Sequence, residues 1–527
     1  MMSISEFMLL FLWLWSGFSF SISHRFFNLG GIFKGSLHFL KYFFVLAYSN
    51  IIEKFSLFFK NKAAVAFSLI YLLHIIGSFY SSDFNYVLKD LRIKVPLILF
   101  PVVFATMEKI NYRKFRILML FYVMAILAGS FISFWLLIQK NFIDIREISP
   151  FISSIRFSLN LSFGFFILLY FIIIDNKFAL LLKLLFALIA IWFFVFIILL
   201  ESVTGFIIVL LISLGFLWWH MFQARRVLYK IIMILIIIVI PAGIVFKIIS
   251  IVDKATTSPI INFNNIDKYS SKGNIYYHDT IDHRVEDGRF VGLYICEEEM
   301  RHAWNERSNI DFDKSGGNGH SIKEGLLRYL TSLDLRKDYD GVYGLSEWDI
   351  KMIENDCANV NYVRNPGFKT RILKILKGYE VYNLTGNPSG SSVMQRIEYL
   401  KASLAVIKEN WLTGVGTGDL EVSLYNKYDE MGSLLKDEFR YHAHNQFFAM
   451  LISFGIFGFL IFIYALIYPP IVTRSFNDYF FIVFFFIMII SMFSDDTLET
   501  QAGVTLFAFF YTFLMFGKTN SNAYFSK

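Results

Sequence analysis

Long apolar runs alternate with short polar connections over most of the chain. Most runs approach the ~20 residues that a helix needs to cross a hydrocarbon core, and the charged residues lie between them. The pattern therefore predicts an all-α polytopic membrane protein with about twelve transmembrane helices. The predicted spans are residues 6–22, 36–52, 63–80, 94–107, 116–138, 153–174, 178–199, 203–221, 228–250, 444–469, 478–494 and 499–516.

Two of these runs depart from a simple retained span. The run at 94–107 is short and contains Pro96 and Pro101, so we expect a broken or re-entrant element whose unpaired backbone is covered by protein. The first run lacks a basic segment before it and a small-residue cleavage site after it. It is therefore interpreted as a retained helix and not as a removed signal peptide.

The basic residues of the short connections indicate the orientation. Lysines and arginines gather after the even-numbered spans, and such residues favour the cytoplasmic side. We therefore expect both termini in the cytoplasm and the long segment 251–443 outside it. The residues used are Lys54, Lys60, Lys62, Lys109, Arg113, Lys114, Arg116, Arg225, Arg226, Lys230, Lys518 and Lys527.

The polar segment divides the chain into three predicted parts. Residues 1–250 form an N-terminal membrane bundle of about nine helices, 251–443 a mainly helical periplasmic loop domain, and 444–527 a C-terminal bundle of about three helices. Within the loop domain we predict a helix over 346–357. A second helix follows Gly390, carries apolar residues at spacings of three and four, and ends at Gly414.

Composition agrees with a membrane protein and limits its partners. The chain of 527 residues is 56% hydrophobic and 17% charged, with a formal charge of +7. Because the basic residues lie mostly in short loops on one side, the charge reports topology and predicts no nucleic-acid ligand. Cys296 and Cys357 both fall in the polar segment; a disulfide and two free thiols are both compatible with that placement.

Two histidines stand where the polar segment turns back into apolar sequence. His442 and His444 precede the span at 444–469, with Asn445 beside them and Arg440 just upstream. Imidazole can accept a hydroxyl proton near neutral pH, and Asn445 can orient the ring or hold a substrate oxygen. The alternative is a pair of interfacial histidines whose tips lie among lipid head groups.

Two arginines are candidates for binding an anion. Arg396 lies near the start of the second loop helix, where a cation opposes the helix dipole but completes a phosphate site. Arg156 lies at the start of the span at 153–174, suited to an anionic lipid head. Solvation of Arg396 and snorkelling of Arg156 are the alternatives.

Glycine and carboxylate residues complete the set. The run from Gly414 to Asp419 lets backbone approach a ligand closely, although a helix-ending turn explains it equally well. Asp495, Asp496 and Glu499 gather between the last two spans, as turn carboxylates or as partners of the arginines. No zinc or calcium pattern is complete, so we predict no metal site.

In combination these motifs resemble the O-antigen ligase and polymerase superfamily, and within it the Bacteroidetes type of O-antigen ligase. The resemblance extends from Ile70 onward. It is carried by Arg396 and by 410–419, 443–447, 454–458, 155–159, 329–338 and 496–501.

The resemblance implies a glycosyltransferase of GT-C type that uses no metal or cofactor. Such enzymes move a glycan from undecaprenyl diphosphate to lipid A core oligosaccharide at the periplasmic face of the inner membrane, and direct displacement inverts the anomeric centre. We expect His444 as general base and Arg156 and Arg396 as the diphosphate clamp. The expected substrate-binding residues are Asn445, His442, Arg440, Gly416, Asp419, Asp496 and Glu499.

Four other functions remain open from sequence. An O-antigen polymerase or a protein O-oligosaccharyltransferase would share the fold and the chemistry. A lipid-linked-glycan transporter would place charged or unwound helices near the membrane midplane, whereas here the polar residues gather at one edge. A receptor or scaffold would tolerate the loss of His444.

Overall fold

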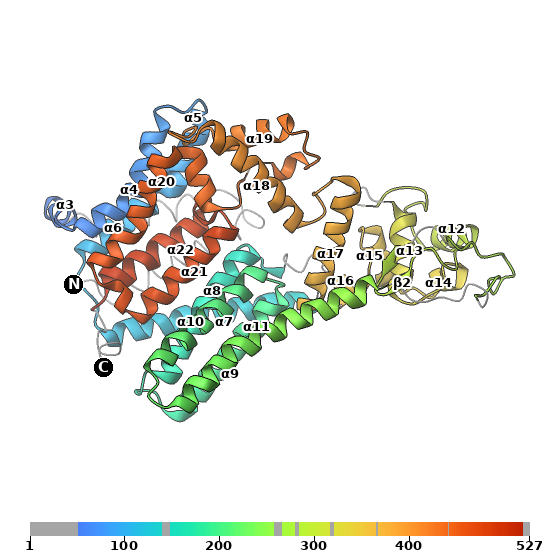
Figure 1. Cartoon of the computed structure of the whole chain (residues 1–527), viewed down its shortest axis with the longest axis horizontal. Helices are drawn as coiled ribbons and strands as arrows, with labels where there is room; N and C mark the ends of the chain where they lie inside the picture. The colour runs from blue at the N-terminus through green and yellow to red at the C-terminus, as the bar shows by residue number, and fades with distance from the viewer. Residues whose placement is uncertain are drawn as a thin grey trace, which may run out of the picture.

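A computed structural model describes residues 51–139, 148–257, 266–279, 284–316, 321–364, 367–440 and 442–519. These residues are mainly helical, with a single two-stranded sheet (Figure 1). The apolar part comprises α3 (Ile51–Lys60), α4 (Lys62–Ser78), α5 (Phe84–Lys94), α6 (Pro96–Thr106), α7 (Tyr112–Gln139), α8 (Ser154–Ile173), α9 (Leu180–Leu199), α10 (Val203–Gln223), α11 (Val227–Thr256), α20 (Gln446–Val472), η4 (Ser475–Asn477), α21 (Tyr479–Ser494), η5 (Thr497–Glu499), α22 (Gln501–Thr512) and η6 (Phe513–Gly517). The polar segment comprises β1 (Val285–Glu286), β2 (Arg289–Phe290), α12 (Glu297–Arg307), α13 (Ile322–Ser332), α14 (Tyr339–Tyr343), α15 (Glu347–Glu354), α16 (Asn361–Arg364), α17 (Phe368–Thr385), α18 (Ser392–Glu409), α19 (Leu420–Glu430) and η3 (Asp437–Phe439).

The helices identify a multi-pass membrane protein but do not confirm twelve spans. Among the described residues, six helices are long and apolar enough to cross a membrane, namely α7, α8, α9, α10, α11 and α20. The pair α3 and α4, bent by 96°, would be a seventh if it counts as one span. Helices α21 and α22 are apolar but shorter. The predicted span at 6–22, and all but the last two residues of 36–52, lie outside the described residues.

The predicted short element at 94–107 is an unbroken helix, α6. Its 11 residues cover only ~16 Å at 1.5 Å per residue, about half of a hydrocarbon core. Pro96 occupies its first position, where a missing N–H is tolerated. The helix packs against α4 and α22, so protein covers it.

The two ends of α21 mark two faces of the bundle. At its start Asp478 caps the helix and pairs with Lys518, and the backbone of Lys518 bridges to Ile110. At its end the chain turns at Asp495 towards His444. The loop after α6 and the segment after α22 therefore share one face, and the candidate site lies at the opposite end of α21.

A break inside α20 accommodates the glycine-rich loop. Gly455 has φ +58° and ψ −164°, which interrupts the helix. Gly416 N–H donates to the Ser453 carbonyl at 2.9 Å, and Ile456 N–H donates to the Trp411 carbonyl at 2.8 Å. The loop therefore satisfies backbone groups that the break would leave unpaired at membrane depth.

The polar segment beyond α11 has its own hydrophobic core. Trp304, Tyr329 and Leu330 lie fully buried within it, and its helices α12–α16 gather beyond the tip of α11 (Figure 1). The hairpin β1–β2 turns through Asp287 and Gly288, both with positive φ, as a two-residue turn of this twist requires. The helix predicted over 346–357 is observed as α15, fixed by a capping box at its start. Both cysteines are buried free thiols.

Helices α18 and α19 pack on α20 and join the polar segment to the membrane bundle. Their shared core runs from Tyr399 to Ile452, across the predicted boundary at 443; the three predicted parts stay a prediction. The predicted end of the second loop helix at Gly414 is wrong, because α18 ends at Glu409. Gly414, with φ +73°, instead enters the α20 break, where a Cβ would lie 2.4 Å from Phe454 N.

Candidate active site

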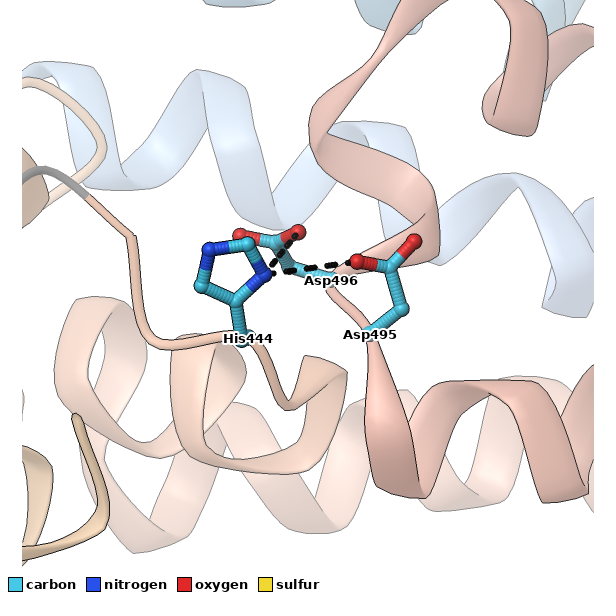
Figure 2. Close-up of side chains that lie close together, drawn as sticks. All are labelled: His444, Asp495 and Asp496. Atoms are coloured by element: carbon cyan, nitrogen blue, oxygen red, sulfur yellow. Dashed lines mark hydrogen bonds and ion pairs between the residues drawn. The ribbon is translucent and has the colours of Figure 1, made fainter. Parts of the chain in front are cut away.

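His444 lies at the entrance of α20, one residue before the helix cap. Its φ of +46° is uncommon for a residue with a side chain, and such conformations gather at functional sites. The imidazole stacks on Tyr399 of α18 with ring centroids 4.6 Å apart. Its Nδ1 lies 3.4 Å from Asp495 Oδ1 and 3.9 Å from Asp496 Oδ1 (Figure 2). The side chain is 31% exposed, so one edge is held and another is open.

Asp495 and Asp496 follow the last residue of α21, and their side chains are almost completely buried. Burial alone would raise the pKa of Asp495, but a hydrogen bond from His444 and the charge of Arg156 hold that pKa below its ordinary value. Burial and the neighbouring Asp495 carboxylate raise the pKa of Asp496. The pKa values of the two adjacent carboxyl groups are thus shifted in opposite directions, and Asp495 is the more readily ionised of the two.

Arg156 reaches the same carboxylate from the start of α8. The Ser153 hydroxyl caps this helix and accepts a hydrogen bond from Arg156 Nη1 at 2.9 Å. Arg156 Nη2 donates to Asp495 Oδ2 at 3.3 Å. Its Nε is buried and has no hydrogen-bond partner among the described residues. The guanidinium is therefore anchored at one edge only.

Arg396 approaches the site from α18. Its charge contributes to lowering the pKa of Asp495. Burial raises the pKa of Tyr399 to about 12, and Arg396 opposes that rise. Arg396 therefore lies close enough to act on both the Asp495 carboxylate and the ring that supports His444. Two predicted arginines and the predicted histidine converge around one aspartate.

Residues 363–463 match the family model described as O-antigen ligase. This part of the chain, called the matched segment below, is similar to an O-antigen ligase domain. The resemblance found in the sequence to that superfamily is confirmed over this segment, whose members are membrane glycosyltransferase-like enzymes. No curated protein matches the chain.

The matched segment supplies only part of the site. His444, Arg396 and Tyr399 fall within the matched residues, whereas Arg156 and the Asp495–Asp496 pair come from helices outside them. The cluster therefore assembles only when the matched segment folds against the rest of the membrane bundle.

His442 and Asn445 flank the site. His442 Nδ1 lies 3.4 Å from Asp496 Oδ2 without hydrogen-bond geometry, and the His442 side chain is 41% exposed. Asn445 caps α20 by accepting from Phe448 N–H, and its amide donates to the Phe493 carbonyl at 3.0 Å. Asn445 thus joins the start of α20 to the end of α21, and its contact with substrate stays a prediction.

Three other expected binding residues contact the protein itself. Arg440 donates to the carbonyls of Ser433 and Leu435 and pairs with Asp429, which fixes the loop before η3. Gly416 packs against α4, where a Cβ would lie 2.6 Å from the Ser81 hydroxyl. The observed close approach of this glycine loop is therefore to protein backbone and side chains.

Asp419 likewise accepts hydrogen bonds from the backbone N–H groups of Ser82 and Asp83 and from the Ser82 hydroxyl. It ties the matched segment to the turn between α4 and α5. Substrate contacts of Arg440, Gly416 and Asp419 stay predictions.

Glu499 lies behind the site. One of its oxygens accepts from Lys94 Nζ at 2.6 Å and the other from Gln446 Nε2 at 2.9 Å, and its side chain is 4% exposed. These contacts give Glu499 a place in the protein's interior framework, whereas Asp496 remains at the site.

His444, Asp495 and Asp496 are also a possible metal-ligand group. Each offers one ligand atom, and these atoms lie within 4.8 Å of one another, whereas the sequence predicts no metal site. Three such ligands are a set that a divalent cation can use. Arg156, which donates to Asp495, and Arg396, whose charge acts on the same carboxylate, place positive charge beside this group and so oppose the binding of a cation there.

Sequence reasoning missed two partners of His444. The sequence offered Asp495 as a turn carboxylate or as a partner of an arginine, and its contact with Arg156 confirms the second alternative; its contact with His444 was not predicted, and Tyr399 was not singled out. The only sequence signal for Tyr399 is its position three residues after Arg396, which places both on one face of a helix. Asp495 carries no signal that pairs it with a residue 51 positions earlier.

Proposed function

We propose that the protein is an O-antigen ligase that transfers a glycan from undecaprenyl diphosphate to lipid A core oligosaccharide. The observation that carries the proposal is the contact of His444 with Asp495, between Arg156 and Arg396, where the O-antigen ligase domain meets the bundle. A base and two cations around one opening are what glycosyl transfer from a lipid diphosphate requires.

His444 acts as the general base on the acceptor. Because Nδ1 faces Asp495, the tautomer with hydrogen on Nδ1 donates to that carboxylate and leaves Nε2 to accept a proton. As the acceptor hydroxyl loses its proton to Nε2, its oxygen bonds to the anomeric carbon from the side opposite the diphosphate. The bond to the diphosphate oxygen breaks with its electron pair, and the anomeric configuration inverts.

The arginines stabilise the departing diphosphate. Guanidinium groups form paired, charge-assisted hydrogen bonds to phosphate oxygens, and diphosphate is already a competent leaving group. Protein cations then supply the charge stabilisation, so the proposed reaction uses no metal. The GT-C type of fold, an inner-membrane location with cytoplasmic termini and a periplasmic polar segment belong to this proposal.

The test is ligation by purified protein given the lipid-linked donor and the lipid A core acceptor. His444→Ala should lower kcat by ~10²- to 10⁴-fold, the usual contribution of a general base. The matched control is His302→Ala, because His302 lies on α12 with its side chain 68% exposed and should retain wild-type activity. Full activity of His444→Ala would overturn the base assignment.

The product identifies which member of the superfamily the protein is. Glycan appearing on lipid A core supports the ligase. Longer glycan that stays on the carrier lipid would instead identify a polymerase, and glycan on an added acceptor protein would identify an oligosaccharyltransferase. Movement of the donor across a vesicle membrane without any new glycosidic bond would identify a transporter.

A further inference from the structure

A second group of charged side chains lies buried behind the candidate active site. Lys94, at the end of α5, is 1% exposed and contacts Asp90 at 2.5 Å and Glu499 at 2.6 Å. Asp90 in turn lies 3.1 Å from His74 of α4. A buried charge without a partner is strongly unfavourable, so these groups hold one another in fixed places.

Glu499 and Gln446 connect this group to both halves of the site. Glu499 accepts from Lys94 through one oxygen and from Gln446 through the other. The Gln446 side-chain oxygen accepts from Leu498 N–H at 2.6 Å, and Gln446 is completely buried. Gln446 follows His444 by two residues, and Leu498 follows Asp495 by three. The two segments that carry the base and its aspartate are therefore joined by a hydrogen bond within three residues of each.

The contacts within the site are longer than those among Lys94, Glu499, Gln446 and Leu498, which together are called the junction. His444 meets Asp495 at 3.4 Å and Arg156 meets Asp495 at 3.3 Å, near the outer limit for hydrogen bonds. The junction contacts measure 2.6 to 2.9 Å and are shielded from solvent. Short buried contacts fix geometry more tightly than long, partly exposed ones.

We propose that Lys94 is a positioning residue: through Glu499 and Gln446 it holds the turn at 495–499 against the start of α20 and so sets His444 relative to Asp495. Lys94 touches no reacting atom in this scheme. Its effect on catalysis rests on the proposed function, but its effect on the environment of His444 does not.

The experiment compares Lys94→Met with Lys89→Met in full-length purified protein. Lys89 lies on the exposed side of the same helix, so its loss should leave both measurements unchanged. Lys94→Met should lower kcat for ligation by on the order of tenfold to a hundredfold, the effect of misplaced catalytic groups. KM for the donor should stay within about twofold of wild type, because a positioning fault acts on the reacting geometry.

A second measurement does not depend on activity. Diethyl pyrocarbonate modifies unprotonated imidazole, and peptide mass spectrometry gives the rate at His444 relative to His302. Lys94→Met should raise that ratio severalfold, because the ring is no longer held against Asp495. The double variant Lys94→Met/Glu499→Gln should lower the ratio again and recover part of kcat. The second substitution removes the buried charge that Lys94→Met leaves unpaired at position 499, and Asp90 still has His74 nearby.

Gln446→Met decides the question if Lys94→Met does not yield folded protein. It leaves the Lys94–Glu499 pair intact and breaks only the link to α20, so it should raise the His444 ratio and lower kcat. Wild-type values for kcat and for the His444 ratio in a folded Lys94→Met or Gln446→Met protein would overturn the proposal. Wild-type protein that performs no ligation would overturn the proposed function instead, and the modification ratios would still test the positioning role.

Discussion

Two charged clusters lie back to back in this protein, and they differ in how completely they are closed. The outer cluster of His444, His442, Arg156, Asp495 and Asp496 keeps side chains exposed by 15–41% beside its buried aspartates. The inner cluster of Asp90, Lys94 and Glu499 has side chains exposed by 1–4%. The Lys94 ammonium pairs with two carboxylates of the protein. Arg156, in contrast, keeps a buried guanidinium nitrogen that has no hydrogen-bond partner among the described residues, and one edge of the His444 ring is open.

This difference suggests that the outer cluster binds a ligand and that the inner cluster holds the surrounding structure in place. An unused hydrogen-bonding group, such as the buried Nε of Arg156 or the exposed edge of His444, can be used by a ligand, whereas a closed buried network can only fix what surrounds it. We therefore expect substitutions in the inner cluster to act first on stability and substitutions in the outer cluster to act first on catalysis.

The largest expected effect is on stability, from Lys94→Met. Removing one partner of a buried ion pair typically costs about 3–5 kcal/mol, because the other charge is left uncompensated. Asp495→Asn keeps the shape of its side chain and an oxygen that can still accept from Arg156, whose side chain is 15% exposed, so it should cost about 1–3 kcal/mol, less than Lys94→Met. Thermal unfolding in one detergent, with both variants measured beside wild type, checks the comparison; equal losses of stability would abolish the distinction between the clusters.

The next effect is on catalysis and compares the two neighbouring aspartates. Asp495→Asn removes the anion that orients His444 and faces Arg156, so kcat should fall on the order of a hundredfold, or about 2.7 kcal/mol. Asp496→Asn should change kcat by less than about tenfold, since the raised pKa already favours its neutral form. Initial rates at saturating donor measure both. A larger loss from Asp496→Asn would transfer the orienting role to that residue.

The apolar pattern predicted the helices and the start of α20, because helix formation is decided mainly by residues close together in the sequence. Span positions from 116 to 250 and at 444–469 correspond to helices long enough to cross a membrane. His444 could be distinguished from His442 because Asn445 follows it and because 443–447 matches the family motif; the structure shows that Asn445 is the helix cap. Arg156 and Arg396 could be selected because helix starts and membrane edges restrict what an arginine can do.

The contacts between distant segments could not be predicted from one sequence. Lys94 and Glu499 are separated by 405 positions, and no periodicity relates them. Glycines at 414 and 416 were ambiguous, because the same backbone freedom serves a ligand or a close-packed helix break. Only the fold distinguishes these uses, and it places the glycine loop in the break at Gly455.

The smallest effect is a pH dependence of stability that differs between the two aspartates. A carboxyl whose pKa is raised by folding stabilises the protein below its ordinary pKa of ~3.9, and this contribution is lost as pH rises through the raised value. That is the direction for Asp496. Asp495 has a lowered pKa, so its contribution is present above ~3.9 and is lost only as pH falls through the lower value. Between pH 4 and pH 8, Asp496→Asn should therefore gain Tm relative to wild type as pH rises, while the deficit of Asp495→Asn stays nearly constant. A deficit of Asp495→Asn that disappears within this window, well above pH 4, would mean that the Arg156 and His444 contacts do not hold that carboxylate ionised.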